Sequence, residues 1–267
     1  MKSIFLLFLL VCCVAIKAAD PVPQIRAHAH NDYEHTRPLQ DALDCGFGSV
    51  EADIHLVDGR LLVAHDRQSV KQDRTLEALY LDPLHKRVMQ NGGRVYRDGP
   101  SIILLVDVKS EAVPTYTALH ELLANYATML TIFRDGVAIP GAVTVIVSGS
   151  RNEEMMAAQK LRYAAMDGRI EDLERPTSKA LIPLVSDNWQ KVFTWRWKGT
   201  MPPDEARKLK ALVEQAHAGG RLIRFWNTPD TMESWKLLHD AGVDLINTDQ
   251  LAGLQAFLLT RKSDLAK

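Results

Sequence analysis

The sequence predicts a single α/β domain of the (β/α)8 TIM-barrel class, and two features of the chain indicate this fold. Short apolar runs of strand length alternate with helical segments, which is the pattern of a parallel sheet covered by helices. Eight such runs occur within about 250 residues, the usual size of a closed barrel of this class. The predicted strands cover residues 24–30, 48–54, 102–108, 143–148, 163–166, 180–185, 222–226 and 243–247.

Helical segments separate most of these strands. The predicted helices cover residues 39–45, 115–130, 152–161, 203–218, 231–241 and 250–259. Pro203 suits the first turn of its helix, and Gly242 directly follows the end of another. The first strand is not followed by a Gly-x-Gly-x-x-Gly turn, which excludes the usual dinucleotide-binding site.

The N-terminus has the pattern of an export signal. Lys2 precedes an apolar run over residues 4–16, and small residues at Ala18 and Ala19 suit cleavage. Because the run is short for a membrane span, we expect residues 1–18 to be removed rather than kept as an anchor. Residues 19–267 would then form the barrel of a periplasmic or secreted protein. Only Cys45 would remain, so no intrachain disulfide is expected.

The charge balance narrows the range of partners. The formal net charge is -1, and no Lys/Arg-rich run follows the leader. This argues against nucleic acid or a strongly anionic membrane as the main partner, and against stable membrane insertion. A small-molecule ligand suits the sequence better, and no feature indicates an oligomeric state.

Acidic side chains mark the second predicted strand and the one after it. Glu51 and Asp53 are two residues apart, so on a strand they share a face. Val50, Ala52 and Ile54 occupy the other face, which the covering helices require to be apolar. The two carboxylates therefore point into the mouth of the barrel, where barrels of this class carry their chemistry.

Inward-facing carboxylates repel one another unless a cation lies between them. Asp107, on the strand at 102–108, adds a third carboxylate to Glu51 and Asp53. An oxygen-rich set of this kind suits one divalent metal, Ca²⁺ or Mg²⁺. The alternative is a set of salt bridges to Lys109 or Arg224.

Histidines gather in the same part of the chain. Five of the nine lie between positions 28 and 65. His30 ends the first strand, and His65 follows the extended segment at 61–64, so these two form a candidate pair of general base and general acid. His35 and His55 are weaker candidates. The remaining histidines fall in helical segments and are expected at the surface or in packing: His85, His120, His217 and His239.

These motifs resemble the superfamily that joins phosphatidylinositol-specific phospholipase C to glycerophosphodiester phosphodiesterase. The sequence His-Asn-Asp-Tyr at 30–33 is similar to the His-Asn-Thr-Tyr of phospholipase C catalytic domains, and Glu-Ala-Asp at 51–53 matches the Glu-x-Asp metal motif of both families. Residues 58–66 resemble the phosphodiesterase pattern of a glycine, a short apolar strand and His-Asp. Residues 242–249, Gly-Val-Asp-Leu-Ile-Asn-Thr-Asp, resemble the closing signature.

The resemblance implies metal-dependent hydrolysis of glycerophosphodiesters or phospholipid head groups. His30 would act as the base and His65 as the acid, with the metal held by Glu51, Asp53, Asp107 and Asn31. Lys109 and Arg224 would neutralise the phosphate, and Trp226 and His28 would contact the substrate. A hydroxyl next to the phosphate, as in glycerol or inositol, could attack first and give a cyclic phosphate.

The chain departs from the family pattern at two positions. The phosphodiesterase His-Arg-Gly is replaced by His-Ala-His at residues 28–30, which leaves His28 and His30 as rival bases. The third metal ligand is Asp107 where the family has a glutamate.

Two rival functions use the same residues differently. His28 and His30 could be zinc ligands of an amidohydrolase-like hydrolase, although the middle strands supply no further histidines. A non-catalytic barrel could bind a sugar or a head group through aromatic side chains. The candidate aromatic residues are Trp189, Trp195, Trp197 and Trp226.

Overall fold

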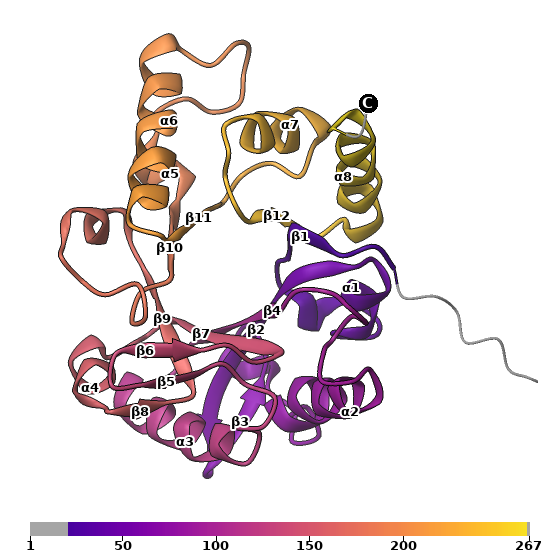
Figure 1. Ribbon diagram of the computed structural model, residues 1–267, viewed down its shortest axis with the longest axis vertical. Coiled ribbons are helices and arrows are strands. Elements are labelled where there is room, and N and C mark those ends of the chain that lie inside the picture. The colour runs from indigo at the N-terminus through magenta and orange to yellow at the C-terminus, as the bar shows by residue number, and fades with distance from the viewer. Residues whose placement is uncertain (1–20, 266–267) are drawn as a thin grey trace, which may run out of the picture.

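Eight parallel strands form a nearly closed barrel in the computed structural model, which describes residues 21–265 (Figure 1). The barrel strands are β1 (Gln24–Ala29), β2 (Phe47–Val57), β4 (Ile102–Val108), β7 (Val143–Gly149), β9 (Ala164–Gly168), β10 (Leu184–Asn188), β11 (Leu222–Trp226) and β12 (Ile246–Thr248). They pair in the order β11-β10-β9-β7-β4-β2-β1-β12, and one bridge between Arg224 and Leu245 joins the two ends. The predicted single-domain (β/α)8 class is confirmed.

Helices cover the outside of the barrel (Figure 1). The α-helices are α1 (Gln40–Asp44), α2 (Asp82–Gln90), α3 (Ala112–Ala124), α4 (Glu153–Ala158), α5 (Trp189–Val192), α6 (Pro203–Ala218), α7 (Met232–Asp240) and α8 (Leu251–Leu265). Shorter helical turns are η1 (Asp32–Glu34), η2 (Arg67–Ser69), η3 (Glu77–Leu81) and η4 (Ile170–Glu174). Within residues 21–265, none of these helices has the length and apolarity that a membrane crossing requires. The predicted leader lies outside the described residues.

Alternation along the strands divides the core into two parts. One face of β2, with Val50, Ala52 and Ile54, packs into the main apolar cluster beneath the helices, as predicted. The barrel interior has its own small aliphatic cluster, formed by Leu105, Ile146, Leu184 and Leu245. Two positions further along these strands the residues are polar: Asp107, Ser148, Ser186 and Asn247. The barrel therefore has an apolar floor and a polar mouth.

The extended segment at 61–64 folds back as a hairpin arm. Strand β3 (Arg60–Val63) pairs antiparallel with β2. Asp58 and Gly59 form the turn with φ values of 49° and 76°, the backbone that two-residue hairpins favour. Because Ala64 N donates to the Asp53 carbonyl at 3.1 Å, the hairpin carries His65 back beside Asp53 on β2.

Some predicted boundaries are wrong. Strand β10 begins at Leu184 rather than at 180, because residues 179–181 form a turn and Pro183, just before the strand, has no N–H to donate. Helix α3 begins at Ala112, three residues before the predicted start, because Pro114 fits the first turn of a helix. It ends at Ala124 rather than at 130. A small sheet of β5 (Ile132–Arg134), β6 (Val137–Ile139) and β8 (Leu161–Arg162) was not predicted.

Candidate active site

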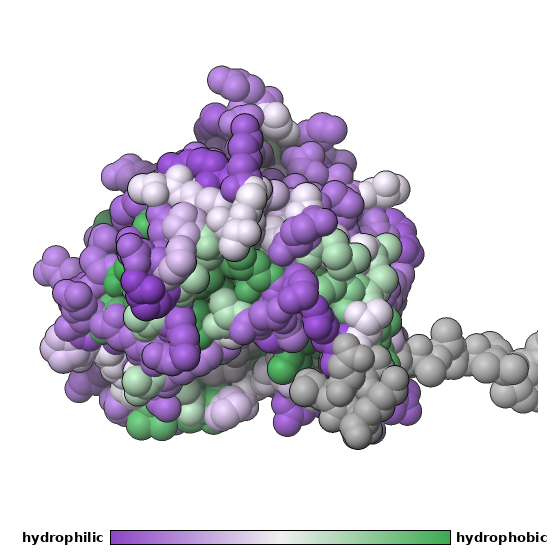
Figure 2. All heavy atoms as spheres, turned by 90° about the horizontal axis from the view of Figure 1, so that it is seen from above, coloured by the Kyte–Doolittle hydropathy of each residue, from purple (hydrophilic) through white to green (hydrophobic). Residues whose placement is uncertain are grey.

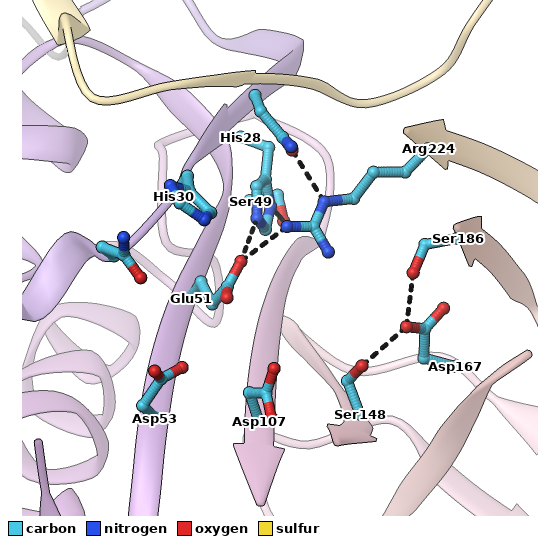
Figure 3. A network of polar contacts seen from close by, with 12 residues as sticks. His28, His30, Ser49, Glu51, Asp53, Asp107, Ser148, Asp167, Ser186 and Arg224 are labelled. Atoms are coloured by element: carbon cyan, nitrogen blue, oxygen red, sulfur yellow. Dashed lines mark hydrogen bonds and ion pairs between the residues drawn. The ribbon is translucent and has the colours of Figure 1, made fainter. Parts of the chain in front are cut away.

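Three carboxylates meet at the mouth of the barrel. Glu51 and Asp53 extend from β2, and Asp107 extends from the neighbouring strand β4, where Asp53 and Asp107 are register partners. Each offers an oxygen, and these oxygens lie within 4.8 Å of one another. Figure 3 shows the three side chains on the same side of the sheet. The predicted convergence of these residues is therefore present.

Glu51 is held from two sides by buried groups. His28 Nε2 lies 2.8 Å from Glu51 Oε2, and Arg224 Nη2 donates to the same oxygen at 2.7 Å (Figure 3). Ser49 Oγ lies 2.7 Å from the other imidazole nitrogen of His28, and Asn247 Oδ1 accepts from Arg224 Nε at 2.7 Å. Although burial opposes it, the charge of Arg224 and the hydrogen bond from His28 hold the pKa of Glu51 well below its usual range.

Asp53 is the centre of a second group of contacts. Its Oδ2 lies 3.0 Å from His65 Nδ1 and 3.1 Å from Lys109 Nζ, and it accepts from the Tyr33 hydroxyl at 2.7 Å. The Tyr33 hydroxyl also lies 2.9 Å from Asn31 Oδ1. Tyr33 thus ties the end of β1 to the carboxylate that orients His65.

The ion pairs in this arrangement leave two carboxylate oxygens available for a metal ion. Lys109 Nζ reaches the Oδ2 atoms of both Asp53 and Asp107, at 3.1 and 3.3 Å. The Oδ1 atoms of both aspartates are also buried and, within residues 21–265, have no hydrogen-bond partner. Buried carboxylate oxygens are costly without a partner. The salt bridges to Lys109 therefore account for the Oδ2 atom of each aspartate. The Oδ1 atoms that remain fit a divalent cation.

Gly149 gives the Asp107 carboxylate its room. This residue ends β7 with φ of 67°, and a Cβ atom there would lie 2.1 Å from Asp107 Oδ1. Burial, together with the charges of Asp53 and Glu51, raises the pKa of Asp107 to about 6, although Lys109 opposes the shift. A bound cation would stabilise the ionised carboxylate of Asp107 and so oppose this rise in its pKa.

His30 is oriented by the last residue of the closing motif. Its Nδ1 lies 2.9 Å from Asp249 Oδ1, which leaves Nε2 for a substrate. Burial alone would lower the pKa of His30, but the hydrogen bond to Asp249 and the charge of Glu51 together raise it. By contrast, burial and the charge of Arg224 lower the pKa of His28 to about 4. Of the two rivals, His30 is the one with an open ring nitrogen, whereas both nitrogens of His28 are engaged.

One pocket of about 190 Å³ opens onto these groups. Eight of the predicted site residues line it: His30, Asn31, Glu51, His65, Asp107, Lys109, Arg224 and Trp226. Asp53 and His28 are fully buried behind this lining. Ser148 and Arg169, which were not singled out from the sequence, complete the wall.

One known family matches the N-terminal part of the chain. Residues 17–167 match the family described as AIM6-like phosphodiesterase domain, which is more than half of the chain. The chain belongs to this AIM6-like phosphodiesterase family. Residues 223–252 also match the glycerophosphoryl diester phosphodiesterase family. The two matched ranges contain every residue that was predicted for the site.

Relatives of the AIM6-like family span most of this chain. Altered inheritance of mitochondria protein 6 homolog from Arthroderma benhamiae is 27% identical, over 89% of this chain and 84% of the relative. Altered inheritance of mitochondria protein 6 from Eremothecium gossypii is 28% identical, over 90% and 72%. The Saccharomyces cerevisiae protein of the same name is 27% identical, over 88% and 70%.

Solved structures agree with the barrel. The glycerophosphodiester phosphodiesterase from Agrobacterium tumefaciens superposes with a TM-score of 0.52 at 16% identity, covering 88% of this chain and 99% of that one. This likeness shows the fold. The AIM6-like match and the glycerophosphoryl diester phosphodiesterase match confirm the predicted membership of the superfamily of glycerophosphodiester phosphodiesterases and phospholipase C-like barrels.

The rival sites find little support in the AIM6-like barrel. Among residues 21–265, the group of possible metal ligands contains three carboxylates and no histidine, so the zinc-site rival has no cluster. Of the four tryptophans proposed for a binding cleft, Trp189 is fully buried and Trp226 lines the pocket beside the carboxylates. Trp195 and Trp197 line a separate apolar cavity of about 940 Å³ between α6 and α7. On the side of these helices, Figure 2 shows hydrophobic residues framed by hydrophilic ones.

Several residues of the site were not given a role from the sequence. Tyr33 and Asp249 both lie inside motifs that were recognised, so their position beside His30 and the metal motif was a usable signal. Gly149 follows a predicted strand and precedes a serine, which marks only a turn. Asp167, which accepts hydrogen bonds from Ser148 and Ser186, has no sequence signal of its own.

Proposed function

We propose that this protein hydrolyses phosphodiesters of the glycerophosphodiester or phospholipid head-group type, with one divalent cation, Ca²⁺ or Mg²⁺. The observation that carries the proposal is the pair of buried Oδ1 atoms of Asp53 and Asp107 beside Glu51, which have no hydrogen-bond partner among residues 21–265. These three residues would hold the cation, and Asn31 would add an amide oxygen. When bound, the cation would neutralise the non-bridging phosphate oxygens as charge develops.

Two histidines would move the protons. Each has its Nδ1 next to a carboxylate, His30 beside Asp249 and His65 beside Asp53, so each presents Nε2 to the substrate. His30 accepts the proton of the attacking hydroxyl as the new P–O bond forms. His65 gives a proton to the leaving alcohol oxygen as the opposite P–O bond breaks.

The attacking hydroxyl decides the product. Attack by water gives a phosphomonoester and an alcohol. Attack by a neighbouring hydroxyl of the substrate gives a cyclic phosphate and the same alcohol. Lys109 would help to fix the phosphate from between Asp53 and Asp107, and Trp226, which is partly exposed, would pack against the alcohol. His28 and Arg224 would act indirectly, by fixing the Glu51 carboxylate.

Phosphorus NMR tests this proposal directly. Protein from Ala19 onward would be offered glycerophosphocholine, glycerophosphoinositol and phosphatidylinositol, each with Ca²⁺, Mg²⁺ or EDTA. We expect metal-dependent loss of at least one diester, and a cyclic phosphate would appear as a separate resonance. No turnover of any of them by protein that binds the cation would overturn the proposal.

Histidine variants test the proton-transfer roles. His30→Ala and His65→Ala should each lower turnover by roughly 10²- to 10⁴-fold, the usual share of general acid–base catalysis. His85→Ala on α2 is the control, because this residue lies outside the pocket. Near-wild-type turnover in either of the first two variants would remove that histidine from the mechanism.

We also propose that the protein is exported and loses residues 1–18. The support is the apolar run that begins at Ile4 and the small residues at the cleavage position. The intact mass of protein recovered from the periplasm or medium should equal that of residues 19–267. A mass that includes Met1 would contradict this proposal.

A further inference from the structure

Two arginines follow the neighbouring strands β7 and β9, and one of them lines the pocket. Arg169 directly follows β9 and lines the same pocket as His30 and Asp107. Arg151 follows β7 by two residues. Neither arginine contacts the three carboxylates in the interactions described above. The proposed catalytic site therefore gives these two arginines no role.

A buried hydrogen-bond network holds one nitrogen of the Arg169 guanidinium. Its Nη1 donates to Asp167 Oδ2 at 2.9 Å and to the Gly168 carbonyl at 2.8 Å. The same Asp167 oxygen accepts from Ser148 Oγ at 2.7 Å and from Ser186 Oγ at 2.6 Å, so three strands contribute (Figure 3). Nε and Nη2 of Arg169 have no hydrogen bond to a residue between 21 and 265, and the side chain is 20% exposed. The guanidinium is therefore held in place with two donor groups unused.

The charges around these arginines balance. Three acids lie near Arg151, and two of them, Asp172 and Glu153, pair with Arg175 at 2.5 and 2.6 Å. The third acid, Asp167, pairs with Arg169 at 2.9 Å. The two unused donor groups of Arg169, and not an excess of positive charge, are therefore what this region offers to an anion.

We propose that Arg169 binds a second anionic group of the substrate, a phosphomonoester carried by one of the two alcohols. The inference rests on the proposed hydrolysis of phosphodiesters and narrows its substrate class. Lys109 and Arg224 are less suited to this task, because each is paired with acids of the carboxylate cluster. The planar fork of arginine matches phosphate oxygens in two-point contacts.

A matched pair of substrates tests the inference. Glycerophosphoinositol and glycerophosphoinositol 4-phosphate differ by one phosphomonoester. Wild-type kcat/KM should be higher for the phosphorylated diester by roughly tenfold or more, the effect of one or two charged hydrogen bonds. Arg169→Gln should lower kcat/KM on the phosphorylated diester far more than on the other. Arg169→Lys, which keeps the charge and loses the fork, should fall between, and Arg151→Gln should have a smaller effect.

Controls separate this effect from general damage. Arg207→Gln removes an exposed arginine of α6 that pairs with Asp204, and it should leave the ratio of the two kcat/KM values unchanged. An equal loss on both substrates in Arg169→Gln would mean that Arg169 contacts the scissile phosphate, and it would overturn the inference. An unchanged preference in Arg169→Gln would overturn it as well.

Calorimetric titration with inorganic phosphate, in EDTA, separates the inference from the proposed function. Arg169→Gln should weaken phosphate binding by roughly tenfold relative to wild type and Arg207→Gln. If no diester is hydrolysed but phosphate binding depends on Arg169, the proposed function fails and the anion site stands. If phosphate binding is the same in all three proteins, the anion site is absent.

Discussion

Arg224 and Glu51, 173 residues apart in the chain, form a buried ion pair of 2.7 Å inside the barrel. Arg224 lies on β11, which is joined to the residues just before β12 by a single bridge, between Arg224 and Leu245, and by the Ile223 carbonyl, which accepts from Asp244 N and Leu245 N. Its side chain also donates to Asn247 on β12 at 2.7 Å. The Arg224 guanidinium thus joins β11 to β12 at the seam where the barrel closes, and it also holds the proposed metal ligand Glu51 in place.

Replacing Arg224 should therefore damage folding as well as catalysis. Arg224→Gln leaves Glu51 with a buried and partly uncompensated charge, for which we expect a loss of about 3–5 kcal/mol in the free energy of unfolding. Urea denaturation measures this loss. Arg207→Gln on the surface of α6 is the control and should change stability by less than about 1 kcal/mol. A similarly small effect in Arg224→Gln would show that the seam does not depend on this pair.

Gly149→Ala should disable the carboxylate cluster. The added Cβ would lie 2.1 Å from Asp107 Oδ1 and 2.4 Å from the Val108 carbonyl, so Asp107 has to move. We expect weaker Ca²⁺ binding in calorimetric titration and a loss of about 1–3 kcal/mol in stability.

Gly136→Ala is the matched control for this prediction. Gly136 has φ of 78°, so alanine suffers the same backbone strain there, but no atom lies within 4 Å of the added Cβ. Its Ca²⁺ affinity should equal that of wild type. If the two variants bind Ca²⁺ equally well, Gly149 makes no room that the metal site needs.

The carboxylate cluster was predictable because strand alternation and the fold class determine it. Strand alternation places Glu51 and Asp53 on one face, and the barrel class brings Asp107 beside them. The position of His65 depends on the hairpin, and its turn was visible as Asp58-Gly59.

The parts that were not predictable depend on distant partners. From the sequence, Arg224 was expected to bind phosphate, and its salt bridge to the carboxylates was named only as an alternative, because nothing near it in the chain shows that Glu51 occupies one of its donor groups. The same holds for Asp167, whose partners come from two other strands. The start of β10 was set by Pro183 and by pairing with β11, and an apolar run does not reveal register.

Asp249→Asn should shift the pH profile of catalysis. The hydrogen bond and the charge of Asp249 help to raise the pKa of His30, so the variant should have a lower pKa at His30. A general base must be neutral, and the acidic limb of kcat/KM should therefore move to lower pH. In a His30→Ala background, Asp249→Asn should have little further effect, because the aspartate acts through the histidine.

Asp240→Asn serves as the control for the pH profile. Asp240 pairs with Lys236 on α7, outside the pocket, so its loss should leave the acidic limb in place. An acidic limb that is also unmoved in Asp249→Asn would assign it to a group other than His30.

Asp32→Asn should change how stability depends on pH. Asp32 is fully buried, and its Oδ2 accepts from Leu39 N at 2.5 Å and from the Tyr80 hydroxyl at 2.9 Å. Burial raises its pKa from 3.8 to about 6, against the effect of these hydrogen bonds. Between those two pH values the folded state therefore holds more protons than the unfolded state, and wild-type stability falls as pH rises through this window.

An asparagine at position 32 keeps an oxygen for both donors and carries no charge to bury. The variant should gain stability relative to wild type as pH rises from about 4 to 6, by roughly 2–3 kcal/mol at neutral pH. Urea denaturation at several pH values measures the difference, and the exposed Asp73→Asn should show none. A difference between Asp32→Asn and wild type that stays constant across this window would mean that Asp32 is ionised in the folded protein throughout. The paired groups around it, rather than burial, would then control its charge.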